Sequence, residues 1–61
     1  MNDQDVIKEA YADALKNLYR VLADAYAAAQ QDKTALQQAV QRFKTGLALA
    51  RAARDAALAS L

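Results

Sequence analysis

The 61-residue chain has no cysteine, no histidine, no proline and no tryptophan, and it has a single glycine. Without cysteine no disulfide can form, and a structural zinc site built from Asp and Glu alone would be unusual. Small scaffolds are normally stabilised by disulfides, by a structural metal or by association with another chain, because their own cores are small. The sequence therefore predicts association with a partner, and it predicts no cofactor and no metal.

The same absences bear on catalysis. The chain offers no nucleophilic cysteine, no histidine to act as a base near neutral pH, no glycine-rich phosphate loop and no Glu-x-x-His metal pair. Glu9 and Asp13, the nearest approach to a carboxylate pair, are four residues apart on a helix face that ordinarily contacts solvent. We therefore expect that the protein is not an enzyme.

Charge is nearly balanced, with eight Lys and Arg against seven Asp and Glu. This is not the strongly basic balance of a dedicated nucleic-acid binder. Charged residues interrupt the chain, so that no apolar run approaches the ~20 residues needed to span a membrane. The polar first residues, Asn2 to Asp5, do not resemble a signal peptide. We expect a cytoplasmic protein that does not act at a membrane.

Alanine, the strongest helix former, occupies 17 positions, and together with leucine, lysine, arginine and glutamine it predicts an all-α fold. Asn2, Asp3 or Asp5 can cap the first helix. The apolar residues of each half recur every three or four positions, as on one face of a helix. They are Ile7, Tyr11, Ala14, Leu18, Val21, Ala25 and Ala28, and then Leu36, Val40, Phe43 and Leu47. Both stripes are broader than the seam of a simple coiled coil.

The midpoint, QQDKTALQQAV at residues 30–40, either turns or continues as helix. The apolar spacing runs through it in register, so that a single rod ~90 Å long is the alternative. The rod would bury Asp32, and one partner could not cover faces this broad. Thr34 and Gln37 form a capping box, and Asp32 is an alternative cap.

We therefore predict an antiparallel two-helix hairpin, with helix 1 over about 4–31, a turn at about 31–34 and helix 2 over about 35–60. No glycine or asparagine ends the first helix, so that Gln30, Gln31 or Lys33 must take any left-handed conformation.

Folding at this turn places residue i opposite about residue 65 − i. Tyr11 then lies near Arg54, in position for a cation–π contact. Opposite charges also come together: Asp13 with Arg51 and Arg54, and Asp24 with Arg42. Gly46, one of the small residues that recur every seven positions, either lets the helices approach closely or is simply tolerated.

Apolar surface remains after the two helices pair, and exposed apolar patches of this kind signal association. We predict that the hairpin dimerises into a four-helix bundle. Its function would be that of a small non-enzymatic protein-interaction or regulatory module. The candidate dimer or partner interface is Leu15, Leu18, Tyr19, Leu22, Tyr26, Phe43 and Leu47. Alternatively, the tyrosines only close the edge of the bundle, with their hydroxyls in water.

Other partners remain open. A basic stripe on helix 2, formed by Lys44, Arg51 and Arg54, gives the alternative function of a small nucleic-acid-binding regulator. Such a stripe is more often the polar face of a helix. A helix from another protein, in place of a second copy, could also complete the apolar flank.

Overall fold

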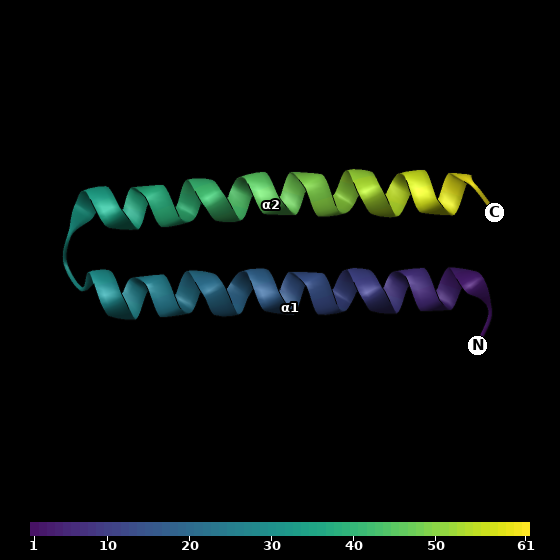
Figure 1. Ribbon diagram of the computed structural model, residues 1–61, viewed down its shortest axis with the longest axis horizontal. Coiled ribbons are helices and arrows are strands. Elements are labelled where there is room, and N and C mark those ends of the chain that lie inside the picture. The colour runs from purple at the N-terminus through teal and green to yellow at the C-terminus, as the bar shows by residue number, and fades with distance from the viewer.

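The computed structural model describes all 61 residues, which form two α-helices of 27 residues each. Helix α1 spans Asp3–Ala29 and helix α2 spans Lys33–Ala59. They lie side by side and run antiparallel, with both termini at the end opposite the turn (Figure 1). The predicted all-α hairpin is confirmed, and the alternative of one continuous rod is wrong.

Helix α1 begins after Asn2, whose side-chain Oδ1 accepts a hydrogen bond from the backbone N–H of Asp5 at 2.9 Å. Among the three residues considered as caps, Asn2 is therefore the one used. Asp3 and Asp5 occupy the first turn, where their charges favour the positive end of the helix dipole.

The turn is tight and depends on Gln30. The backbone N–H of Asp32 donates to the carbonyl of Ala29 at 3.0 Å. Gln30, with φ 53 and ψ −110, is the only non-glycine residue with a positive φ. These angles are close to those of the first central residue of a type II′ turn, a position that glycine normally fills. The expectation that one of three residues near the turn takes a positive φ is confirmed for Gln30.

Asp32 caps helix α2, its Oδ1 accepting a hydrogen bond from the backbone N–H of Ala35 at 3.2 Å. The predicted capping box of Thr34 and Gln37 is wrong, because α2 has already begun at Lys33 and Thr34 lies within its first turn. The connection consequently occupies residues 30–32, slightly earlier than the predicted 31–34.

Two contacts fix the register of the helices. The guanidinium carbon of Arg54 lies 4.5 Å from the centre of the Tyr11 ring, so the predicted cation–π contact is confirmed. A Cβ added at Gly46 would lie 2.5 Å from Cδ2 of Leu18. Gly46 therefore has a packing role, because a larger residue would meet the opposite helix.

The predicted charge pairs between the helices do not form. The only ion pair joins Nε of Arg54 to Oδ1 of its neighbour Asp55, at 3.0 Å. Asp13, Asp24 and Arg42 are exposed. Water solvates such charges well, and holding two long side chains together costs conformational entropy, so exposed pairs contribute little. These predicted pairs were wrong for this reason.

The hairpin is a single layer of helices. Its Cα atoms extend over 45 × 18 × 6 Å. Only Ala39 is buried, with 6% of its surface exposed. Stable domains normally pack two layers around a core. This chain on its own provides one layer and leaves both broad sides of it uncovered.

Candidate interaction surface

One broad side of the layer carries both exposed tyrosines of α1. A groove on this side places Tyr26 beside Leu36, Val40 and Lys44 of α2. Residues seven apart lie on the same side of a helix, and residues four apart are neighbours on it. We therefore define the tyrosine face by six residues, which are Leu15, Tyr19, Leu22, Tyr26, Val40 and Leu47.

The tyrosine face has an apolar centre that is incompletely covered, and polar residues of α2 border it, because Gln37, Gln41 and Lys44 also line the groove beside Tyr26. Tyr19 is 66% exposed and Tyr26 is 45% exposed. The four aliphatic residues are half-buried. Tyrosine is enriched in protein interfaces, because its ring offers a large rigid apolar area while its hydroxyl can stay in water.

The opposite side, which we call the alanine face, is made mostly of small side chains. Val21 and Arg42 line a hollow of ≈ 120 Å³ there. Ala10, Ala14 and Ala53 line a second hollow of ≈ 300 Å³. Two larger apolar side chains project on this side, Val21 and Leu49, at 62% and 66% exposed. Leu49 is assigned to this side because Ala53, four residues later on α2, lines the second hollow.

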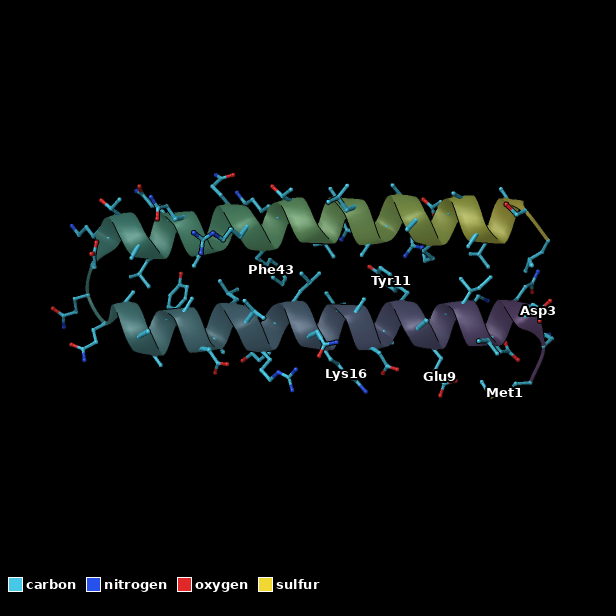
Figure 2. The ribbon with its side chains drawn as sticks, viewed as in Figure 1. Met1, Asp3, Glu9, Tyr11, Lys16 and Phe43 are labelled. Atoms are coloured by element: carbon cyan, nitrogen blue, oxygen red, sulfur yellow. The ribbon has the colours of Figure 1, made fainter.

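The structure divides the predicted interface residues into two groups. Leu15, Tyr19, Leu22, Tyr26 and Leu47 lie on the tyrosine face by their spacing, and Leu22 also reaches the hollow beside Val21 on the alanine face. Leu18 and Phe43 instead occupy the contact between the two helices: Leu18 packs at Gly46, and Phe43 points from α2 toward α1 (Figure 2). Sequence reasoning omitted Val40 from the interface, although its spacing of seven from Leu47 places it on the same side of α2.

The three predicted basic residues also differ in their surroundings. Lys44 and Arg51 are exposed, and neither has a carboxylate within 4.0 Å. They are seven residues apart and form a positive edge beside the tyrosine face. Arg54 is only 30% exposed, and its guanidinium is engaged by the Tyr11 ring and by Asp55. Arg54 therefore belongs to the packing of the hairpin more than to a free basic stripe.

The outer side of α1 is polar, and Glu9 and Lys16 point away from α2 (Figure 2). No cluster of three or more His, Cys, Asp or Glu side chains is arranged to hold a metal ion. Neither helix combines the length and apolar character needed to cross a membrane. Comparison with known protein families, with curated proteins and with solved structures finds no match.

The exposed area of the hairpin is large for its mass. The chain exposes 4734 Å². A folded monomer of 6.6 kDa is expected to expose about 3,900 Å². The excess is therefore about 800 Å², which equals the area that each partner buries in an interface of standard size.

Proposed function

We propose that this protein is a non-enzymatic interaction module that acts as a homodimer. In this dimer the tyrosine faces of two hairpins pack together, and the product is a four-helix bundle. The observation that carries the proposal is the single layer with one buried residue, Ala39. A second layer is what such a fold requires to enclose a core, and a second copy supplies it with the simplest closed symmetry.

The choice of the tyrosine face rests on the size of its side chains. It combines two exposed tyrosines with four half-buried aliphatic residues, whereas the alanine face offers Val21, Leu49 and otherwise mainly the methyl groups of alanines. The hydrophobic contribution of a surface rises with the apolar area removed from water. The excess exposed area of about 800 Å² is also the amount that one such face must bury in an interface of standard size.

A nucleic-acid-binding function has less support. Arg54 is engaged within the hairpin, so that Lys44 and Arg51 are the only exposed cations of the predicted stripe. Affinity for nucleic acid grows with the number of phosphates neutralised, and two cations on a chain of net charge +1 provide little of it.

Sedimentation equilibrium over a range of micromolar concentrations tests the proposal. The expected result is a mass of twice 6.6 kDa, with a melting temperature that rises with protein concentration because only the folded state associates. A mass of 6.6 kDa at every concentration, with a cooperative melt that does not depend on concentration, would overturn the proposal.

A matched pair of variants tests which face associates. Tyr19 and Leu49 are equally exposed, at 66% each, but lie on opposite sides of the layer. The Tyr19→Ser/Tyr26→Ser variant is expected to dissociate at higher concentrations than the wild type, while Leu49→Ser keeps the dimer. Weakening by Leu49→Ser alone would show that the alanine face is the interface.

A further inference from the structure

The arrangement of the second copy follows from the charges on the two helices, if the proposed dimer through the tyrosine face is accepted. Two symmetric arrangements keep every neighbouring pair of helices antiparallel. In the first, both turns lie at the same end, and α1 of each copy faces α2 of the other. In the second, the turns lie at opposite ends, and α1 faces α1 while α2 faces α2.

The two helices differ strongly in charge. Helix α1 contains five acidic and three basic residues, for a net charge of −2. Helix α2 contains one acidic and five basic residues, for a net charge of +4. Packing like helices together therefore places +4 against +4 and −2 against −2. Packing unlike helices together brings opposite net charges side by side.

The two arrangements also differ in which charged residues meet at the interface, because Lys44 and Arg51 form the positive edge of the tyrosine face. With the turns at opposite ends, Lys44 and Arg51 of both copies line the same groove between two α2 helices. The only acidic residue of α2, Asp55, is already paired with Arg54. Like charges facing each other in an interface disfavour that arrangement.

With the turns at the same end, Lys44 of the positive edge lies beside a tyrosine of the second copy instead of beside its cations. Contacting residues within the hairpin, Leu18 with Gly46 and Tyr11 with Arg54, have numbers that add to 64 and 65. Residues whose numbers add to 64 or 65 therefore lie at the same height along the helix axis. A two-fold axis parallel to the helices does not change this height, so that Lys44 lies level with residues 20 and 21 of the second copy. Its nearest exposed aromatic residue there is Tyr19. An ammonium beside a tyrosine ring is a favourable pairing, of the kind that Arg54 and Tyr11 already make within the hairpin.

We infer that the tyrosine face is covered by the same face of a second copy with both turns at the same end, so that α1 of each chain packs against α2 of the other. All four chain termini then lie together at the opposite end of the bundle. The occupant of this surface is thus a second copy in one defined orientation.

Single cysteine variants test this orientation, because the natural chain has no cysteine. Gln31→Cys marks the turn and Ser60→Cys marks the open end, and the Cα atoms of the hairpin extend 45 Å along this direction. Each variant, and an equimolar mixture of the two, is treated with a bis-maleimide that spans the ~10 Å between packed helices. Products are identified by intact mass. Lys16→Cys, on the outer side of α1, reports random collisions.

The expected result is that Gln31→Cys and Ser60→Cys each link efficiently to themselves, while the mixture gives no Gln31-to-Ser60 product. Efficient linking in the mixture alone would overturn the orientation and leave the dimer intact. Equal linking of Lys16→Cys would mean random collision and would also overturn it. Absence of every product, together with a mass of 6.6 kDa, would overturn the proposed dimer itself.

Discussion

Replacing Gln30 with glycine is expected to stabilise the protein. Gln30 has φ 53 and ψ −110, and no other non-glycine residue has a positive φ. A side chain in this region crowds the adjacent carbonyl, and sparsely populated backbone conformations of this kind cost about 1–3 kcal/mol. Glycine has no Cβ and adopts the same angles without that steric cost.

Part of this gain is lost because glycine makes the unfolded chain more flexible, which costs about 0.4–1 kcal/mol. The net increase in the free energy of unfolding is therefore about 1 kcal/mol. For a chain of this size, it corresponds to a rise in melting temperature of about 4–8 °C.

Thermal unfolding followed by far-UV circular dichroism, at one fixed protein concentration, measures the change. The matched control is Gln31→Gly, next in the turn, where φ is not positive. That variant has the flexibility cost without relief of strain, and it is expected to lower the melting temperature. If both variants lowered it equally, the reasoning about Gln30 would be refuted.

Three further outcomes are expected. Asp32→Ala removes the cap of α2 and should lower the free energy of unfolding by about 1 kcal/mol, whereas Thr34→Ala should change it little; a larger loss from Thr34→Ala than from Asp32→Ala would favour the capping box instead. Gly46→Leu would place side-chain atoms where the end of the Leu18 side chain lies, and an overpacking cost of about 1–3 kcal/mol should exceed the gain of about 1 kcal/mol from replacing a glycine within a helix; an unchanged melting curve would contradict the packing role of Gly46. A double-mutant cycle with Tyr11→Leu and Arg54→Gln should give a coupling of about 0.5–1 kcal/mol, and additive effects would show that the contact contributes nothing.

The hairpin and its register were predictable because burial decides them. Two broad apolar stripes need to face each other, and the midpoint of the chain is the only place where folding achieves this. The position of the turn was less predictable, because residues 30–40 contain two competing caps. The structure uses Asp32, not Thr34, as the cap of α2. As a result α1 ends at Ala29, and Gln30 takes a positive φ. Sequence spacing alone does not rank these two caps.

The division of the interface residues could not be predicted from spacing. Periodicity describes one wide apolar stripe on each helix, and Leu18 belongs to that stripe as much as Leu22 does. Only the direction in which the helices approach each other separates the residues between them, such as Leu18 and Phe43, from those of the tyrosine face. The charge pairs failed for a different reason, because exposed side chains such as Asp24 and Arg42 gain little from meeting.

The burial of a single residue, Ala39, changes what mutational tolerance would reveal about this protein. In most domains, sensitive positions mark the interior, and contacts with other molecules stand out weakly against that background. Here few positions are interior beyond those between the two helices, such as Leu18, Phe43 and Gly46, so that the other sensitive positions in a complete substitution scan would trace the footprint of whatever covers the hairpin. Sensitive positions on one broad side and tolerant ones on the other would give that footprint directly, without knowledge of the covering molecule.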